Sequence, residues 1–450
     1  MTCQFVPPYL LDRLAEATDD PYLTGCCGQT RALDAGLRER RATAPPSMAQ
    51  PSDADGTKTI YSAGGATQLP GAKVRGDADP PTGDPAVDEA YDSSGIVHEL
   101  FFTAFGRSGI DDAGSTVTVT VHYGEDYDNA FWDGEQLVFG DGDGRVFERF
   151  TKPPDVLFHE FAHGVTQFTA DLRYSGQSGA LNESMSDCFA AMALQRMLDQ
   201  TAEEAHWLIG EGLFKPGIQA VALRSMREPG TAYDDPLLGK DPQVGSMQDY
   251  VETTADNGGV HINSGIPNKA FALAALRLGG YSWERTGQIW YAALTGGAVG
   301  RDTRFAGFAA ATVAAAQELY GEEEADDVRA AWSEVGVEPG QDAPVSGELP
   351  PAEGRVVVSR SGGFAGIGRE VTLDLDEGPL GAEVAALLER TDFAGLPSRD
   401  EDDAGADRFV YTFSYGAQQV TVPESALTPE LEQVASLVLG HDGTGLSDTP

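Results

Sequence analysis

Cysteine is scarce in this chain of 450 residues: there are four, and Cys3, Cys26 and Cys27 lie among the first 30 positions. Thiols so few and so clustered exclude a disulfide framework for the body of the protein. Long apolar runs are missing as well, since no segment approaches the roughly 18 apolar residues that a membrane-spanning helix needs. The sequence therefore predicts no membrane span, and its 41% of apolar residues can form sizeable cores.

Basic residues are also few: 30 Lys and Arg stand against 71 Asp and Glu, which gives a net charge of −41. A charge of that sign repels nucleic acids and anionic membranes, so neither is expected as a partner. Two explanations of the acidic excess stay open, adaptation to high salt and an acidic surface without such adaptation.

The first residues, MTCQFVPPYLL, contain no basic region, and Pro7 and Pro8 interrupt their apolar stretch. A secretory signal is therefore not expected. The expected location at synthesis is the cytoplasm, and export by a route that needs no signal is the open alternative.

Two polar, proline-containing stretches divide the chain, TAPPSMAQPSDADGTK from Thr43 and EPGQDAPVSGELPPAEG from Glu338. Helical patterns precede the first stretch at Tyr9–Ala17 and Arg31–Arg41. Alternating residues such as TVTVTVHYG then favour strands, and the patterns from Pro153 to Val335 are mostly helical. The expected fold class is α+β, with units at residues 1–50, 51–153 (strand-rich), 154–337 (helical), 338–353 (linker), 354–440 (small α+β) and 441–450 (tail).

The unit at 354–440 has a pattern of its own. Strands are expected around Arg355–Ser359 and Glu370–Leu375, followed by a helix at Leu380–Leu388. Two more strands, RFVYTFSY and QQVTV, precede a last helix that begins near Thr428.

The pentapeptide His-Glu-Phe-Ala-His spans His159 to His163. On a helix, residues four apart lie on one face, so both imidazoles can reach one metal ion. Pro153 and Pro154 suit the start of such a helix. Glu160 points in neither histidine's direction, which suits a general base that is not a ligand. The alternative is a core helix with two hydrogen-bonded histidines.

A catalytic zinc ion takes three protein ligands and leaves one position open. Glu183, in the helical pattern ALNESMSDCFAAMAL, is the third candidate. Asp187 follows it by one turn and can accept the other N–H of a ligand histidine, which fixes the tautomer. The alternative is a solvated helix face, but the apolar neighbours of both carboxylates favour a buried helix.

Five motifs stand in one order along the chain: NAFWDG (129–134), HEFAH, NESMSD (182–187), LRSM (223–226) and DNGGVHINSG (256–265). Together they resemble the thermolysin family of zinc metallopeptidases over roughly residues 57–336. VPPYLLDRL resembles the short propeptide motif of the protealysin-like group. The resemblance implies a two-lobe peptidase with one catalytic zinc, peptide substrates, and a propeptide at residues 1–50.

The resemblance also implies roles for single residues. His159, His163 and Glu183 would hold zinc, Glu160 would be the general base, and Asp187 would support a ligand histidine. His261 and Tyr174 would bind the oxyanion, with Asp256 orienting His261. Residues implied to bind the peptide are Asn129, Ala130 and Arg224, and those implied to line an apolar pocket for the residue after the cut are Phe147, Phe150, Val156 and Leu223. Cleavage on the N-terminal side of bulky hydrophobic residues follows from that pocket.

The family's double calcium site is expected to be lost. Asp155 and Glu211 match its ligands, but Leu194 and Leu208 stand where acids would be needed, and calcium takes six to eight oxygen ligands. GDGDG at Gly140–Gly144 fits a calcium loop or a plain turn, and the turn is preferred.

Both ends of the chain are expected to restrain the enzyme. The propeptide would inhibit until it is cut within Thr43–Lys58, and Cys3 would cap the zinc or, in the preferred alternative, be a free buried thiol. The unit at 354–440 resembles emfourin, an inhibitor that accompanies protealysin-like proteases, mainly through the loop RSGGFAGIGRE at Arg360–Glu370. That loop would enter the zinc cleft, or it would form a hairpin that packs on its own core.

Two functions other than that of an endopeptidase are alternatives. The first is a catalytically silent, zinc-containing protein that binds peptides, which would need a disrupted base or a closed coordination shell. The second is a different metallohydrolase, against which the peptide-binding motifs count.

Overall fold

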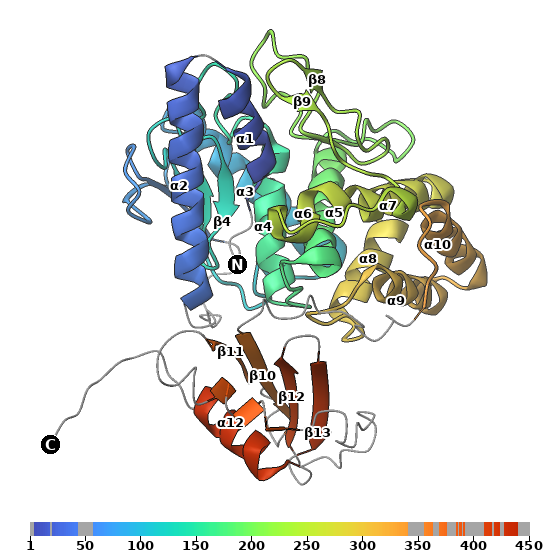
Figure 1. Ribbon diagram of the computed structural model, residues 1–450. Coiled ribbons are helices and arrows are strands. Elements are labelled where there is room, and N and C mark those ends of the chain that lie inside the picture. Colours follow the sequence, from blue (N-terminus) through green and yellow to red (C-terminus); the bar gives the residue numbers. More distant parts are fainter. Residues whose placement is uncertain are drawn as a thin grey trace, which may run out of the picture. The chain divides into compact units, whose positions relative to one another are not determined.

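The computed structural model describes residues 4–18, 20–43, 57–340 and, in the C-terminal part, 355–362, 369–375, 384–385, 387–388, 390–391, 409–415, 418–423 and 427–439. The chain divides into two compact units, Met1–Asp342 and Ala343–Pro450 (Figure 1). The predicted α+β, two-lobe fold is confirmed in the first unit. Among the described helices, none has the length and apolar character to span a membrane.

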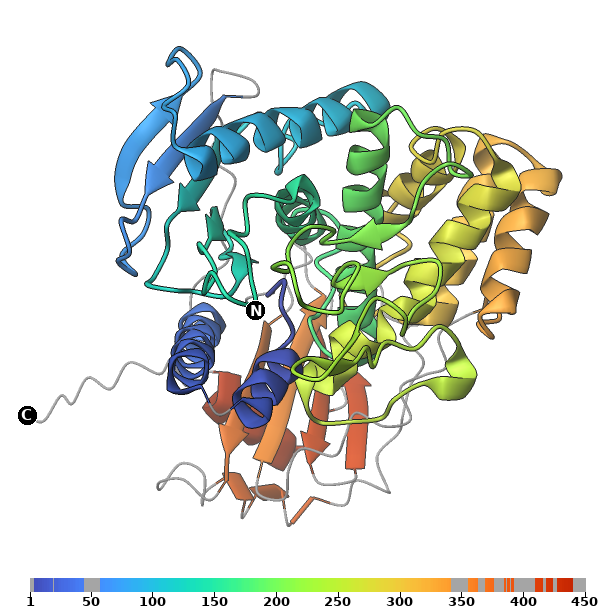
Figure 2. The same ribbon diagram turned by 90° about the horizontal axis from the view of Figure 1, so that it is seen from above.

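Two helices open the first unit, α1 (Pro8–Ala17) and α2 (Pro21–Thr43), and they pack against each other (Figure 2). The second helix begins ten residues before the predicted pattern, whose start was placed at Arg31. Gly25 and Gly28 weaken helix propensity there. Burial of Leu23, Cys27 and other residues against the body of the protein overrides that weakness.

The strand-rich lobe contains a five-stranded mixed sheet in the order β2-β1-β3-β5-β4. Its strands are β1 (Lys58–Ser62), β2 (Ala72–Gly76), β3 (Val117–Val121), β4 (Ala130–Trp132) and β5 (Leu137–Phe139). β4 forms one edge and contacts the helix that carries the histidine pair. A peptide can therefore add to this edge through backbone hydrogen bonds.

A long helix in this lobe, α3 (Pro85–Phe105), was not predicted. The Asp84 side chain caps its first turn by accepting from the Ala86 N–H, and Pro85 stands at its first position. Buried Val97 and Phe101, four residues apart, keep one face against the core. The lobe is thus a sheet covered by a helix rather than strands alone.

The second lobe is built from helices α4 (Pro154–Gln167), α5 (Gly176–Met197), α6 (Asp256–Asn263), α7 (Gly265–Leu278), α8 (Arg285–Thr295), α9 (Phe305–Leu319) and α10 (Glu322–Glu334). Mostly helical structure was expected throughout this lobe, but the segment between α5 and α6 is not helical. It contains the two-residue strands β6 (Leu208–Ile209), β7 (Arg224–Ser225), β8 (Asp234–Asp235) and β9 (Gly239–Lys240) and a 3-10 turn, η1 (Met247–Asp249). Frequent Gly and Pro explain the irregular backbone of this segment.

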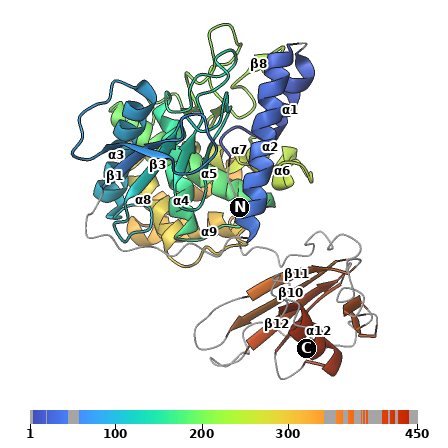
Figure 3. The same ribbon diagram turned by 90° about the vertical axis from the view of Figure 1, so that its left-hand side faces the viewer.

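The C-terminal unit holds an antiparallel sheet in the order β11-β10-β12-β13, with α12 (Pro429–Leu439) packed on it (Figure 3). Its strands are β10 (Arg355–Gly362), β11 (Arg369–Asp374), β12 (Phe409–Tyr415) and β13 (Gln418–Pro423). Val356, Val358 and Phe413 of the sheet and Leu431 and Val434 of the helix form its separate core. The four predicted strands and the last helix are thus found. The predicted helix at 380–388 and the glycine-rich loop lie partly outside the described residues.

His122 ties three segments of the first lobe together. It follows β3, and its Nδ1 lies 2.8 Å from Asp141 while its Nε2 lies 3.1 Å from Asp84, the residue that caps α3. The hydrogen bond to Asp141, reinforced by the charge of Asp84, raises the pKa of His122. Because the folded-state pKa is raised, this contribution to stability is complete below the unfolded value of about 6.5 and disappears as pH rises through the folded value.

The wild type should lose Tm as pH rises from about 6 to about 9, because His122 loses its proton in that range. His122→Gln cannot titrate there, so its Tm should fall less. Thermal melts of the wild type and the variant across that range measure the effect. His206→Gln, at an exposed histidine, is the control and should melt like the wild type. Parallel melting curves for the wild type and His122→Gln at all pH values would contradict this role.

Candidate metal centre

The pair His159 and His163 lies on α4, which starts at Pro154 and is buried along most of its length. The two rings are in contact, with 4.6 Å between their centroids and 2.9 Å between their Nε2 atoms. Gly164 permits the tight packing of this helix, since a Cβ there would lie 2.6 Å from Ile110. Both imidazoles therefore present Nε2 to a single point.

Helix α5 packs against α4 and brings Glu183 to the same point. Its Oε2 lies 3.4 Å from Nε2 of His159, and its Oε1 lies 3.5 Å from Nε2 of His163. One ligand atom from each of the three side chains lies within 4.8 Å of the others, and all three residues are buried. The structure thus brings together the three predicted zinc ligands.

The outer nitrogens of both histidines are occupied. Nδ1 of His159 lies 2.8 Å from Asp187, and Nδ1 of His163 lies 2.8 Å from the side-chain oxygen of Asn182. Because both partners are acceptors, each Nδ1 carries a proton, and both Nε2 atoms are then available as ligands. This role of Asn182 was not predicted, although the residue stands directly before Glu183 in the NESMSD motif.

A divalent cation fits this arrangement. Oε2 of Glu183 is buried without a hydrogen-bond partner, and burial lowers the pKa of His163 to about 3, so that its Nε2 is a neutral donor. Burial opposes the charged form of His159, but the hydrogen bond to Asp187 and the charges of Asp187 and Glu183 outweigh it and raise the pKa to about 9. A bound cation would displace the Nε2 proton, because metal ligation requires the neutral imidazole. Two imidazoles and one carboxylate are a ligand set of catalytic zinc.

Glu160 is fully buried, and neither of its carboxylate oxygens has a hydrogen-bond partner. Burial raises its pKa to about 8. A bound zinc ion would favour the charged form, because an opposite charge lowers a carboxyl pKa. The side chain therefore has the proton affinity and the free oxygens that a general base needs.

His261 lies on α6 after a left-handed turn formed by Asp256, Asn257, Gly258 and Gly259. A Cβ on Gly258 would lie 2.9 Å from the backbone nitrogen of Gly176, so the turn requires glycine there. The turn returns the Asp256 carboxylate to His261, with Oδ1 2.6 Å from Nδ1.

The electrostatics of His261 suit a hydrogen-bond donor. Although burial opposes it, the charges of Asp256 and Glu183 raise the pKa of His261 to about 9. Tyr174 lies beside it, with its hydroxyl 3.3 Å from Nε2 and donating to Glu183. The two predicted oxyanion donors thus lie together next to the metal ligands.

Arg224, on β7, joins the metal ligands to the peptide-binding side of the site. Its Nε and Nη2 donate to the two oxygens of Asp187 at 2.9 and 2.8 Å, and Asn268 donates to the same carboxylate at 2.8 Å. Asn268 was not predicted.

The residues Gln4, Phe5 and Val6 occupy the cleft between these groups. Nε2 of His261 donates to the Gln4 carbonyl at 2.9 Å, and Nη1 of Arg224 donates to the Phe5 carbonyl at 3.1 Å. The three residues are buried. Inhibition by the propeptide was expected, but the binding of these three residues was not, because their partners His261 and Arg224 lie more than 200 positions away in the sequence.

The same segment pairs with the sheet edge. The Phe5 N–H donates to the Ala130 carbonyl at 3.1 Å. Asn129 accepts from the Val6 N–H at 2.8 Å and donates to the Val6 carbonyl at 3.2 Å. The N-terminal segment thus adds to the edge that was predicted to bind peptides.

The Phe5 ring is fully buried. It meets the His159 ring edge-on at 5.2 Å between centroids, and the Arg224 guanidinium lies 4.7 Å from its centre. It shares one apolar core with the four residues predicted to line the pocket, Phe147, Phe150, Val156 and Leu223.

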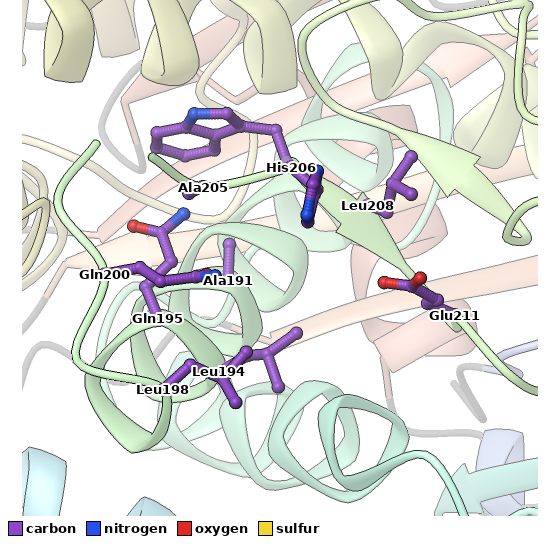
Figure 4. A pocket seen from close by; sticks show the side chains of 10 residues that line it. Ala191, Leu194, Gln195, Leu198, Gln200, Ala205, His206, Leu208 and Glu211 are labelled. Carbon is purple, nitrogen blue, oxygen red and sulfur yellow. The ribbon is translucent and has the colours of Figure 1, made fainter. Parts of the chain in front are cut away.

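A separate pocket lies where the calcium ligands were considered (Figure 4). Leu194 and Leu208 line it together with Glu211, while Oδ2 of Asp155 accepts from the Gly210 N–H at 2.6 Å. Apolar side chains thus stand where additional oxygen ligands would be needed. Loss of the double calcium site stays a prediction.

Cys3, which was considered as a cap on the zinc or as a free buried thiol, lies outside the described residues.

We expect Asn182→Ala to weaken zinc binding by about 10–100-fold, because the His163 ring loses the acceptor that orients it. Competition with a chromogenic chelator measures the affinity. Asn263→Ala is the matched control, since Asn263 is also buried but bonds the backbone of Val251. Equal zinc affinities for the two variants would exclude the orienting role.

Comparison with known proteins places these features in a family. Residues 54–167 match the thermolysin metallopeptidase catalytic domain, residues 170–337 match the thermolysin metallopeptidase alpha-helical domain, and residues 358–439 match Emfourin. An extracellular metalloprotease of Pectobacterium carotovorum subsp. carotovorum is 47% identical over 337 residues, which cover 75% of this chain and 96% of that protein. Protease PrtS of a Photorhabdus strain is 45% identical over 339 residues, which cover 74% and 91%.

The solved structure of the protealysin precursor, a metalloproteinase from Serratia proteamaculans, matches with a TM-score of 0.68 and 48% identity, and covers 74% of this chain and 99% of that chain. Together with the buried His159, His163 and Glu183 group, these similarities agree with the family inferred from the motifs. The chain belongs to the thermolysin family of zinc-dependent metallopeptidases and carries an Emfourin domain after its peptidase lobes.

Proposed function

We propose that this peptidase is made as a latent precursor and cuts proteins on the N-terminal side of bulky hydrophobic residues. The observation that carries the proposal is the position of Phe5, whose apolar ring is buried beside His159 while its carbonyl is held by Arg224. An apolar side chain that follows a cut would find the same surroundings, and none of the four predicted pocket residues could neutralise a charged side chain.

Each residue of the site has a part in the proposed reaction. When bound, zinc polarises the substrate carbonyl and makes water a stronger nucleophile. Glu160 takes a proton from the attacking water and delivers it to the leaving nitrogen. His261 and Tyr174 donate to the carbonyl oxygen as it becomes negative, and one such donor is typically worth about 10²–10³ in rate. Arg224 holds the next carbonyl of the peptide.

The chain without residues 1–50 is expected to cut an unfolded protein before Phe, Leu and similar residues, and Glu160→Gln in the same chain to lower the rate by about 10²–10⁴-fold while zinc stays bound. Mass-spectrometric mapping of the products and metal analysis measure both effects. Cuts before Lys, Arg or Asp would overturn the specificity. Peptide binding without turnover would instead fit the silent zinc-containing binding protein.

Latency is supported by the helices that follow the cleft segment. Asp34 of α2 accepts from the Tyr127 hydroxyl at 2.5 Å and from the Asn129 side chain at 3.1 Å. Thr30, one turn earlier, accepts from the Asp128 N–H at 3.1 Å. Asn129 thus contacts α2 and Val6 at once, so the helix supports the blocked state of the peptide-binding edge.

Removal of residues 1–50 should raise hydrolysis of a short peptide by about tenfold or more, because a tethered segment competes at high effective concentration. Asp34→Ala in the full chain should raise the hydrolysis rate by part of that amount. Glu16→Ala, at an exposed acid of α1, should leave the rate unchanged. Initial rates on one fluorogenic peptide compare the four proteins. Equal rates for a folded truncated chain and the full chain would refute inhibition by the propeptide.

We also propose that the Emfourin domain restrains the peptidase. The support is its family match and its separate core, which suit a tethered module. The residues 363–368 of the glycine-rich loop lie outside the described residues, so the loop remains part of the proposal. The competing role is a domain for substrate docking or export.

Truncation after Val337, in a chain already freed of residues 1–50, should speed hydrolysis of a short peptide. Adding the separate C-terminal domain should reverse the gain, with a dependence on its concentration. Initial rates with and without the added domain test this. Unchanged rates after truncation would favour the docking or export role.

A further inference from the structure

The N-terminal segment is bound in the register and direction of a substrate. Three successive residues engage three successive groups of the site: the Gln4 carbonyl meets His261, the Phe5 carbonyl meets Arg224, and Val6 pairs with Asn129. These groups were assigned, in the same order, to the oxyanion, to the following carbonyl and to the peptide-binding edge. A segment that ran in the opposite direction would reverse this order.

This register singles out one peptide bond. The bond that joins the His261-bound carbonyl to the residue in the apolar surroundings is Gln4–Phe5. Its nitrogen is already fixed, since the Phe5 N–H donates to Ala130 at 3.1 Å. Several contacts hold one geometry at once, which is the condition under which proximity lowers a barrier.

The N-terminal segment leaves the general base unbound and contacts the oxyanion donor. Both oxygens of Glu160 are buried and without a partner in the hydrogen-bond network. Nε2 of His261 lies 2.9 Å from the Gln4 carbonyl oxygen, and the Asp256 carboxylate holds the other ring nitrogen. The segment thus fills the cleft without using either oxygen of Glu160, and it places the Gln4 carbonyl on the oxyanion donor His261.

We propose that the peptidase hydrolyses its own Gln4–Phe5 bond. The oxygen of a water molecule forms a bond to the Gln4 carbonyl carbon, and the bond from that carbon to the Phe5 nitrogen breaks. Glu160 takes one proton from the water and passes it to the Phe5 nitrogen. The products are a peptide that ends in the Gln4 carboxylate and a chain that begins with the Phe5 amine. The inference rests on the proposed preference for a bulky residue after the cut.

The cut does not by itself free the cleft. Phe5 would keep its ring beside His159 and its carbonyl on Arg224, and Val6 would keep both bonds to Asn129. The helices α1 and α2 follow directly and hold this end through Asp34 and Thr30. The trimmed precursor would therefore stay latent, with its new N-terminus bound as the product of one turnover.

The test compares four full chains after purification and incubation with zinc: the wild type, Glu160→Gln, Phe5→Asp and Phe102→Asp. Intact-mass measurement and N-terminal sequencing report the first residue. We expect the wild type to begin at Phe5 and Glu160→Gln to retain Gln4. Phe5→Asp should also retain Gln4, because a charged side chain is rejected after the cut. Phe102→Asp makes the same change at a half-exposed residue of α3 and should be trimmed like the wild type.

Further variants separate the possible failures. Phe5→Leu keeps a bulky apolar side chain and should be trimmed, which guards against misfolding of Phe5→Asp. A wild type that retains Gln4, while the chain without residues 1–50 digests an added protein, would overturn this inference alone. Loss of residues 1–4 from Glu160→Gln as well would assign the cut to another protease and overturn it too. No digestion by either chain would instead count against the proposed function.

Discussion

The Asp187 carboxylate is the point on which the rest of the site depends. Its two oxygens accept from Nδ1 of His159, from Nε and Nη2 of Arg224, and from the Asn268 side chain. All four residues are buried. One charged group therefore fixes a predicted metal ligand, His159, and Arg224, which holds the Phe5 carbonyl, so a shift of either would disturb the other. Four elements, α4, α5, β7 and α7, meet at this carboxylate.

Sequence predicted the parts of this site that depend on local order. The spacing of His159 and His163, with Pro154 at the helix start, predicted α4, and the 20 residues from His163 to Glu183 allowed a return helix. Helix α3 was not predicted. Its stability comes from burial of one face against the core and from the Asp84 cap, and burial against a sheet depends on the folded structure. The start of α2 was predicted at Arg31, ten residues too late, because helix propensity is weak before it and packing stabilises the helix there.

Contacts between distant segments were beyond prediction for a physical reason. Asn182, Asn268 and Asp34 act by hydrogen bonds whose partners are chosen only when the chain has folded. The position of Gln4 on His261 joins residues 257 positions apart. No spacing rule covers such pairs, because their geometry depends on every element in between.

Two of the buried carboxylates near His159, those of Asp187 and Glu160, show how their surroundings give them different roles. Burial acts on both and favours the neutral form. For Asp187, the Arg224 charge and the His159 hydrogen bond overcome burial and lower the pKa to about 2, so it stays ionised and holds its donors. Glu160 has no hydrogen-bonded cation, and burial raises its pKa to about 8. Two carboxyl groups thus differ in role: Asp187 is a fixed anion, and Glu160 can exchange a proton. Such a separation of pKa values is the usual basis for assigning acid–base roles.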